Sequence, residues 1–370
     1  MDAASPSSKQ IDPWRIAVVG FDHMHAGDQI SVIKDHPRAL LVGAWDSNPD
    51  RMQQVCAELE VPPHLQYGDL DALIAETAPQ IAVVCSTTAD HRRYVDYFVE
   101  RGIHVLLEKP LASTVNDARA IVGAAASAPG VLVGVNWPLA WYPVHRTARR
   151  LISEGVIGCV LEVHYYDGNR GPLFHTHGKH EVDDAEVAKA KASTWWYSAA
   201  EGGGSLRDYL GYGATLATWF RDGELPTDVT ARTHISPGDE VDEQSVVIAS
   251  YRSGLSTFQT RWGTFTDPWT HQPYPRCGFV IVGSAGTIAS FDYAEAVQVQ
   301  DNAHPEGQAI PVDELAPGDT GGVPNLIHAL DHGLPLEGPV SLEVSMAGHL
   351  IVEAAAQSAA DQTPVRLDTL

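Results

Sequence analysis

The sequence predicts two domains: an α/β domain with a doubly wound parallel sheet, then an α+β domain built on a mostly antiparallel open sheet. Over about the first 135 residues, nearly continuous apolar runs alternate with amphipathic stretches, as expected for strands buried between helices. Beyond them, strand-like segments follow one another through short turns. We expect a flexible tail over 1–13, the α/β domain over 14–136 and the α+β domain over 137–370, whose C-terminal helix packs back on the first domain.

Apolar runs and turn residues place the elements of the first domain. The predicted strands are 16–19, 40–45, 81–85, 103–107 and 131–135. The predicted helices between them are 50–59, 90–101 and 114–127. Pro49 suits a first helical turn, and Gly102 suits the residue that follows a last turn. Strands alternating with helices in this way are typical of a nucleotide-binding domain.

The second domain has a different pattern. Helices are predicted at 142–154, 205–220 and 342–360. The predicted strands are 160–166, 228–234, 245–251, 256–262, 279–282, 287–291 and 296–300. Residues 168–194 are expected to form a long ordered loop over a site, because long loops in compact domains are usually functional or disordered.

Charge and cysteine usage exclude several classes of partner. The 370 residues include 24 Lys and Arg against 47 Asp and Glu, a formal net charge of −23. This charge opposes nucleic acid and anionic membranes, so we expect neither as a partner. The four cysteines show no Cys-x-x-Cys spacing, which argues against a disulfide framework or a structural zinc site. No apolar run reaches the ~18 residues that a membrane span needs. The first residues are small and polar, which argues against a secretory signal. We therefore expect a cytoplasmic location.

The first predicted strand ends in the turn Gly20-Phe21-Asp22-His23-Met24-His25. A dinucleotide fingerprint has glycine at three positions here, and only Gly20 is present. Asp22 replaces the glycine beside the pyrophosphate, where its charge would repel phosphate. An ordinary strand-to-helix turn is the alternative interpretation.

Asp46 closes the second predicted strand. An acid at this place accepts the ribose hydroxyls of NAD and repels the 2′-phosphate of NADP, which favours NAD. The alternative interpretation is that Asp46 only forms the turn 46–49 and binds no ribose.

Glu108-Lys109-Pro110 follows strand 103–107, at a sheet edge that faces the ligand crevice in open α/β folds. A partly desolvated lysine can exchange protons near neutrality. A surface lysine paired with Glu108 is the alternative.

Several segments together resemble one enzyme family. They are Cys85-Ser-Thr-Thr-Ala-Asp-His91, the segment 102–112 around Glu108-Lys109-Pro110, Ile152-Ser-Glu-Gly-Val-Ile-Gly158 and the glycine-rich segment 201–213. The chain from about Arg15 to Leu367 resembles the glucose–fructose oxidoreductase / inositol dehydrogenase / MocA (Gfo/Idh/MocA) family, and the turn at Gly20 departs from it. The resemblance implies an N-terminal Rossmann domain, NAD as cofactor, sugars, cyclitols or related polyols as substrates, and a homodimer or homotetramer.

The resemblance also implies which residues act. Lys109 matches the active-site lysine and Asp208 the acid of the glycine-rich helix start, whereas Tyr212 stands where many members carry a catalytic histidine. Tyr212 would accept the hydroxyl proton if Lys109 lowers its pKa, or Lys109 would be the base and Tyr212 the residue that orients the substrate. Asp208 and Tyr212 are four residues apart in the predicted helix 205–220, so they lie on the same face of that helix. A helix-start acid and a packed aromatic are the structural alternatives.

The predicted catalytic residues are therefore Lys109, Tyr212 and Asp208. The predicted cofactor-binding residues are Gly20, Phe21, Asp22, His23, His25, Asp46, Ser86, Thr87, His91, Glu108, Lys109 and Asn136. The predicted substrate-binding residues are Lys109, Trp137, Arg170, His175, His177, His180, Arg207, Asp208 and Tyr212.

The basic residues of the predicted loop have three interpretations. His175, His177 and His180 lie beside Arg170, and with Arg207 they suit a polyhydroxylated or anionic substrate group. A solvated loop is the second interpretation. A metal site on His-x-His-x-x-His is the third, but loop histidines more often bond polar ligands or solvent, so no metal is predicted.

The leading functional hypothesis is an NAD-dependent oxidoreductase acting on a secondary hydroxyl of a sugar or sugar derivative. The main alternative is an NAD-dependent oxidoreductive glycoside hydrolase, which oxidises, eliminates, adds water and reduces again, with an anionic glycoside as one possible substrate. A non-catalytic sensor and a metal-dependent lyase on the three histidines are further alternatives.

Overall fold

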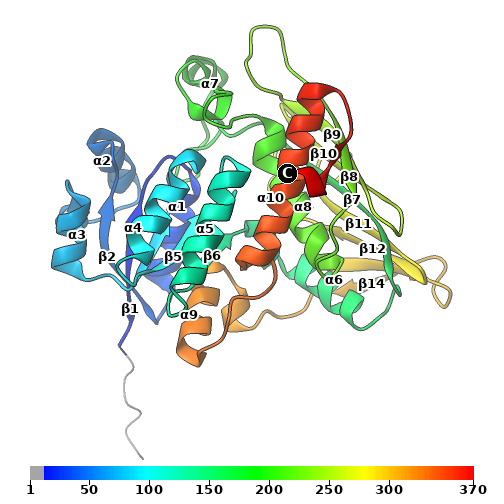
Figure 1. Cartoon of the computed structure of the whole chain (residues 1–370), viewed down its shortest axis with the longest axis horizontal. Helices are drawn as coiled ribbons and strands as arrows, with labels where there is room; N and C mark the ends of the chain where they lie inside the picture. Colours follow the sequence, from blue (N-terminus) through cyan, green and yellow to red (C-terminus); the bar gives the residue numbers. More distant parts are fainter. Residues whose placement is uncertain (1–11) are drawn as a thin grey trace, which may run out of the picture.

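The computed structural model describes residues 12–370 and contains two sheets, one in each domain (Figure 1). Residues 1–11 of the predicted tail lie outside the described residues. The first sheet is parallel throughout, with the strand order β3-β2-β1-β4-β5-β6. Its strands are β1 (Trp14–Val19), β2 (Ala39–Trp45), β3 (Gln66–Tyr67), β4 (Ile81–Val84), β5 (His104–Glu108) and β6 (Val133–Asn136). This is the order of a dinucleotide-binding fold, and it confirms the predicted class of the first domain.

Helices cover both faces of this sheet. They are α1 (His25–Asp35), α2 (Pro49–Glu58), α3 (Leu70–Thr77), α4 (His91–Val99) and α5 (Val115–Ser127). The side chain of Asn48 caps α2 by accepting from the Asp50 and Arg51 amides, and that of Thr114 caps α5 by accepting from the Asp117 amide.

One helix of this domain comes from the far end of the chain. α9 (Gly322–His332) packs its residues Val323, Leu326 and Ile327 into the core that contains Ile16 of β1. The sequence analysis predicted no helix there, nor at α1 and α3. A chain division at 136 therefore does not separate all contacts of the two domains.

The second sheet has nine strands in the order β14-β13-β12-β11-β7-β10-β9-β8-β15, and only its β7–β10 pair is parallel among the described strands. The mostly antiparallel sheet confirms the predicted class. Its strands are β7 (Val160–Asn169), β8 (Asp228–His234), β9 (Gln244–Ser250), β10 (Leu255–Trp262), β11 (Gly278–Gly283), β12 (Gly286–Phe291), β13 (Ala296–Asp301), β14 (Gln308–Pro311) and β15 (Val365–Arg366). β14 and β15 were not predicted.

The helices α6 (Pro143–Ser153), α8 (Ser205–Phe220) and α10 (Leu342–Asp361) belong to this half of the chain. Figure 1 shows α8 and α10 between the second sheet and α5 of the first domain. The Trp137 indole, just after β6, donates to the Ser345 hydroxyl of α10 at 2.9 Å. α8 thus lies in the middle of the molecule, and almost all of its residues are buried.

Residues 168–194 are more regular than the predicted loop. A β-bridge joins His175 to Glu181, and α7 (Asp184–Lys191) follows it. Figure 1 shows α7 above the junction of the two domains. The Asp183 side chain caps α7, which explains why a polar stretch without an apolar period is helical.

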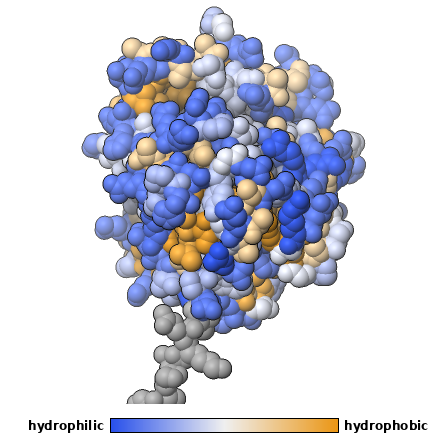
Figure 2. All heavy atoms as spheres, turned by 90° about the vertical axis from the view of Figure 1, so that its left-hand side faces the viewer, coloured by the Kyte–Doolittle hydropathy of each residue, from blue (hydrophilic) through white to orange (hydrophobic). Residues whose placement is uncertain are grey.

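The side of the molecule seen in Figure 2 is mainly hydrophilic, with its apolar residues in separate patches. Within residues 12–370, the helices are all too short or too polar to cross a membrane.

Two glycines allow a matched test of packing around α8. A Cβ added at Gly213 would lie 2.3 Å from the Tyr165 ring, whereas one at Gly123 of α5 would meet open space. We expect Gly213→Ala to destabilise the protein by about 1–3 kcal/mol through overpacking. Gly123→Ala should stabilise it by about 0.5–1 kcal/mol through helix propensity. Thermal unfolding followed by circular dichroism measures both, and equal shifts in Tm would contradict the packing described.

Candidate functional site

The two domains meet at a buried ion pair. β5 ends at Glu108, and Lys109 follows it with only 3% of its surface exposed. Its Nζ lies 2.5 Å from Oδ1 of Asp208, which is also buried, in the first turn of α8. Neither group has much access to water, so each depends on the other for its charge.

Tyr212 lies one helical turn beyond Asp208, with the centre of its ring 5.0 Å from Lys109 Nζ. The ring of Trp137 meets it edge to face at 5.6 Å. Burial, and after it the carboxylates of Glu108 and Asp208, raise the pKa of Tyr212 well above its ordinary value. The phenol therefore keeps its proton, which disfavours the alternative in which Tyr212 is the base.

Glu108 joins the ion pair to the dinucleotide turn. Its Oε1 lies 2.8 Å from His25 Nδ1, and its Oε2 accepts from the Asn136 amide at 3.3 Å. Trp141 completes this network by donating to the Asn136 oxygen at 3.0 Å. Burial raises the pKa of Glu108, but His25 and Lys109 outweigh it and hold that pKa below its ordinary value. Glu108 is therefore a charged acceptor beside the cofactor edge of the sheet.

The turn after β1 has the backbone of a dinucleotide site. Gly20 has φ +81°, and a Cβ there would lie 2.7 Å from the Ser86 backbone nitrogen, so only glycine fits. His23 is buried, and its Nδ1 accepts from the His25 amide at 3.2 Å.

His23 leaves one polar atom unsatisfied. Burial, and after it His25 and Lys109, lower the pKa of His23 well below its ordinary value, so the ring is neutral and its proton is on Nε2. That Nε2 has no hydrogen-bond partner among residues 12–370. A buried donor of this kind is costly unless a ligand supplies an acceptor, and an oxygen of a bound dinucleotide would do so.

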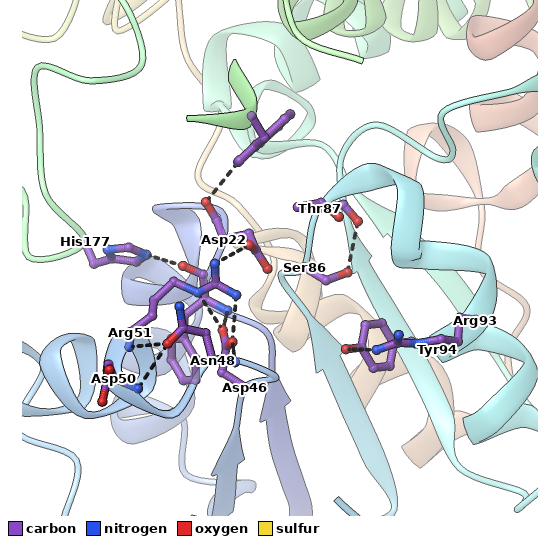
Figure 3. A network of polar contacts seen from close by, with 12 residues as sticks. Asp22, Asp46, Asn48, Asp50, Arg51, Ser86, Thr87, Arg93, Tyr94 and His177 are labelled. Atoms are coloured by element: carbon purple, nitrogen blue, oxygen red, sulfur yellow. Dashed lines mark hydrogen bonds and ion pairs between the residues drawn. The ribbon is translucent and has the colours of Figure 1, made fainter. Parts of the chain in front are cut away.

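A three-residue charge network lies beside this turn (Figure 3). Arg51 of α2 contacts Asp22 through Nη1 at 2.6 Å and Asp46 through Nη2 at 2.7 Å. The charge of Asp22 is therefore paired, which reduces but does not remove its repulsion of a phosphate. Burial, partly offset by Arg51, raises the pKa of Asp22 to about 6.

Asp46 accepts four hydrogen bonds. The Phe21 and Asn48 amides donate at 2.7 and 2.6 Å, and the Arg51 Nε and Nη2 atoms donate at 3.0 and 2.7 Å. A carboxylate has about four acceptor positions, so ribose hydroxyls would have to displace one of these donors. The sequence analysis did not single out Arg51, although its place in the first turn of the helix after Asp46 was visible.

Of the remaining predicted cofactor residues, Ser86 and Thr87 lie near the dinucleotide turn and His91 does not. Ser86 and Thr87 follow β4, and Ser86 packs against Gly20. His91 begins α4, where its Nδ1 donates to the Leu111 carbonyl at 3.3 Å. His91 thus supports the segment after Lys109 rather than the edge of the sheet.

The predicted substrate residues separate into two groups. Lys109, Trp137, Asp208 and Tyr212 come together, as described above. The other basic residues contact acids elsewhere. Arg170 forms ion pairs with Asp267 and Glu181, and His175 lies beside Asp267. Arg207 forms an ion pair with Glu353, and His180 is exposed. These pairings leave no free guanidinium among Arg170 and Arg207 for an anionic substrate.

The three histidines of the predicted loop do not converge. His177 reaches the first domain and donates from Nε2 to the Phe21 carbonyl at 3.0 Å. Potential metal ligands instead meet at His23, His25 and Glu108, whose ligand atoms lie within 4.8 Å of one another. Because His23 carries its proton on Nε2, a hydrogen-bonding role explains this group better than a metal.

Two residues outside the predicted site, Trp196 and Asp167, lie beside it. Trp196 is buried, with its ring 5.7 Å from Lys109 Nζ and 5.0 Å from the His23 ring. Asp167 of β7 accepts from the Tyr165 hydroxyl at 2.8 Å, and burial together with Asp292 raises its pKa to about 8. Asp167 comes directly after the predicted strand 160–166 and lies within the longer observed β7, and no motif marked it.

The fold and the turn define a dinucleotide-binding protein, and comparison with known families makes this definite. Residues 14–136 match the oxidoreductase family with an NAD-binding Rossmann fold, and residues 145–289 match the GFO/IDH/MocA C-terminal domain. The chain therefore belongs to the Gfo/Idh/MocA family of NAD-binding oxidoreductases.

Individual relatives match this chain over only part of its length or at low identity. The chain is 32% identical over 146 residues to an inositol 2-dehydrogenase of Pseudomonas savastanoi, covering 40% of this chain and 42% of that protein. It is 22% identical to a D-apiose dehydrogenase of Rhizobium rhizogenes, covering 71% and 69%. In four of the matches to curated relatives, the aligned region spans less than half of the relative's length. An aldose-aldose oxidoreductase of Caulobacter crescentus has the same fold, with 19% identity, a TM-score of 0.74, and coverage of 96% and 99%.

The raised pKa of Asp22 predicts that NAD binding depends on pH. Above about pH 6 the carboxylate is charged near the pyrophosphate position, so we expect the Kd for NAD to rise several-fold between pH 5 and pH 7. Asp22→Asn should remove this dependence, whereas the exposed Asp35→Asn should retain it. Titration by intrinsic fluorescence measures the Kd, and an unchanged slope in Asp22→Asn would contradict the assignment.

The same shift affects stability with a definite sign. The folded chain holds the Asp22 proton to a higher pH than the unfolded chain does, so this group's contribution to stability is lost as pH rises from about 4 to about 6. The Asp22→Asn variant should lack this loss in thermal unfolding measured across that range.

Proposed function

We propose that the protein transfers a hydride between a secondary hydroxyl of a sugar or sugar derivative and the nicotinamide of NAD. The observation that carries this proposal is the buried Lys109–Asp208 pair beside Tyr212, at the edge of the NAD-binding sheet. Dehydrogenases of a cyclitol and a pentose among the relatives support the substrate class.

The chain's own residues divide the proton chemistry. Bound NAD supplies the hydride acceptor. The ion pair accepts the hydroxyl proton as a unit: Lys109 Nζ gives its own proton to Asp208 Oδ1, which lies 2.5 Å away, and takes the proton of the substrate hydroxyl. Tyr212 keeps its own proton and donates a hydrogen bond that orients the reacting oxygen. Lys109 is therefore the proton acceptor in this proposal, and Asp208 and Tyr212 assist it.

The lining of the site favours an uncharged polyol. Aromatic rings of Trp137, Trp196 and Tyr212 lie near Lys109, and such rings suit the C–H faces of sugars. Carboxylates such as Asp208 accept hydrogen bonds from hydroxyls. The guanidinium groups of Arg170 and Arg207 are paired with acids, which speaks against an anionic sugar.

A second candidate is the oxidoreductive glycoside hydrolase, and one observation favours it. Asp167, with a pKa of about 8, holds a proton at neutral pH and could protonate a leaving group. A non-catalytic sensor fits less well, because Lys109, Asp208 and Tyr212 are assembled together. A lyase on three metal-bound histidines fits poorly, because His175, His177 and His180 are apart.

We infer that the protein works in the cytoplasm as a homodimer or homotetramer. All four of its cysteines are free thiols, as suits a reducing compartment. The open face of the second sheet exposes Val246, Ile248 and Leu255, the last with 55% of its surface accessible. Apolar residues clustered on a sheet face suit burial against a second copy.

Substitution of Lys109 tests the proposed chemistry. We expect Lys109→Met to lower kcat by about 10²–10⁴-fold, because it removes the proton acceptor. Tyr212→Phe should lower kcat less, by about tenfold. NAD affinity should stay within about threefold in both variants. A panel of neutral sugars, followed by NADH absorbance and by mass spectrometry of the products, provides the measurement.

The stoichiometry separates the two candidates. One NADH formed for each sugar oxidised supports the dehydrogenase. Free sugar released from a glycoside over many turnovers, without net NADH but only when NAD is present, would establish the hydrolase instead. A Lys109→Met variant with undiminished kcat would contradict both.

A further inference from the structure

One segment of the second domain crosses to the first, and we call residues 170–196 the strap. Its base is fastened to the second domain. The Arg170 backbone amide and Nε both donate to the Asp267 carboxylate, at 3.0 and 2.7 Å. The bridge between His175 and Glu181 then closes the strap into a hairpin whose tip is residues 176–179. The tip is therefore held out from a fixed base.

The tip contacts three elements of the first domain. His177 donates to the Phe21 carbonyl at 3.0 Å, within the dinucleotide turn (Figure 3). The Gly178 amide donates to Glu58 Oε1 at 3.1 Å, and the Thr176 hydroxyl donates to the same oxygen. Lys179 forms a surface ion pair at 2.9 Å with an acid of α1. The strap thus spans both domains across the cofactor edge of the parallel sheet.

Glycines allow this close approach. A Cβ added at Gly27 of α1 would lie 2.1 Å from the His177 carbonyl oxygen, and one at Gly178 would lie 2.7 Å from Glu58 Oε1. Backbone meets backbone at Gly27, so a single methyl group there is incompatible with the observed position of the tip.

The strap reaches the turn a second time through its tryptophans. The Trp195 indole donates to the Asp22 carbonyl at 3.3 Å, and its ring stacks on that of Trp196 at 3.8 Å. Trp196 in turn lies against His23. Two successive carbonyls of the turn, those of Phe21 and Asp22, therefore accept hydrogen bonds from the strap.

These contacts cover part of the turn. His23 is only 3% exposed and lies against Trp196 of the strap, whereas Asp22, Met24 and His25 keep part of their surface accessible. This turn must meet the cofactor in an NAD-binding domain, so a bound dinucleotide would lie beside the strap. The contacts of the tip are few and polar, so the tip can release while the base stays attached.

We propose that the strap is a latch that closes over bound NAD and retains it through successive turnovers. The proposal rests on the NAD binding of the family and not on the identity of the substrate. With the latch intact, opening of the strap limits cofactor release. With the latch weakened, NAD leaves quickly while the Lys109 site is unaltered.

Two variants weaken the latch at different places. Gly27→Ala blocks the seat of the tip, and it is a favourable substitution for helix formation in α1. Glu58→Gln removes the charged acceptor of two strap donors. Glu76→Gln, an exposed change on α3 of the same domain, is the matched control. Circular dichroism and the Tm show that each variant is folded.

The readout is the rate of cofactor release, measured by stopped-flow fluorescence when bound NADH is displaced by excess NAD. We expect release to be at least tenfold faster in Gly27→Ala and in Glu58→Gln than in the wild-type protein and Glu76→Gln. The wild-type protein should also keep NAD through a desalting column, and the two latch variants should lose it. Equal release rates in all four proteins would overturn the proposal.

Faster binding of NADH with unchanged release in the latch variants would also overturn it, because the strap would then only block entry. Failure of the latch and failure of the proposed sugar oxidation are distinguishable. Rapid release together with NADH formation from a sugar rejects the latch alone. Slow, strap-dependent release without any sugar oxidation rejects the substrate class alone.

Discussion

The buried ion pair between Lys109 and Asp208 is the constraint on which the rest of the molecule depends. A lysine at the end of β5 is out of water, and an acid from the other domain, Asp208, forms an ion pair with it. Removal of either partner would leave the other charge buried and unpaired, which typically costs about 3–5 kcal/mol. The pair therefore fixes the position of α8 against the parallel sheet. It also puts Tyr212, one turn along α8, beside the group that handles the proton.

Local sequence patterns predicted most of the fold for identifiable reasons. The strand 228–234 and the helix 205–220 coincide with β8 and α8, because alternating burial and an apolar helical face are both visible in a short window. α1 was missed because it begins inside the dinucleotide turn and has no side-chain cap. α9 was missed because its apolar residues pack on a sheet formed some 300 residues earlier.

Some residues of the candidate site were likewise predicted from the sequence, and others were missed. Lys109, Asp208 and Tyr212 were selected from short motifs, and they lie together. Arg51 and Trp196 were not, since their roles arise from contacts between segments distant in the sequence. The basic loop shows the opposite case. Its residues matched a substrate-binding composition, but Arg170 is tied to Asp267, and His177 serves the junction of the domains. Composition gives the charge of a loop but not its partner.

The filled carboxylate of Asp46 has a consequence for how cofactor preference can change during evolution. Because Asp46 and Asp22 share Arg51, replacing either acid alone leaves the guanidinium with half of its partners. A drift toward NADP would need Asp46 to lose its charge while Arg51 turns to a phosphate, and Asp22 would then have no cation. The three positions are therefore expected to change together in descendants of this protein, so that intermediates with a single replacement are the barrier between the two cofactors.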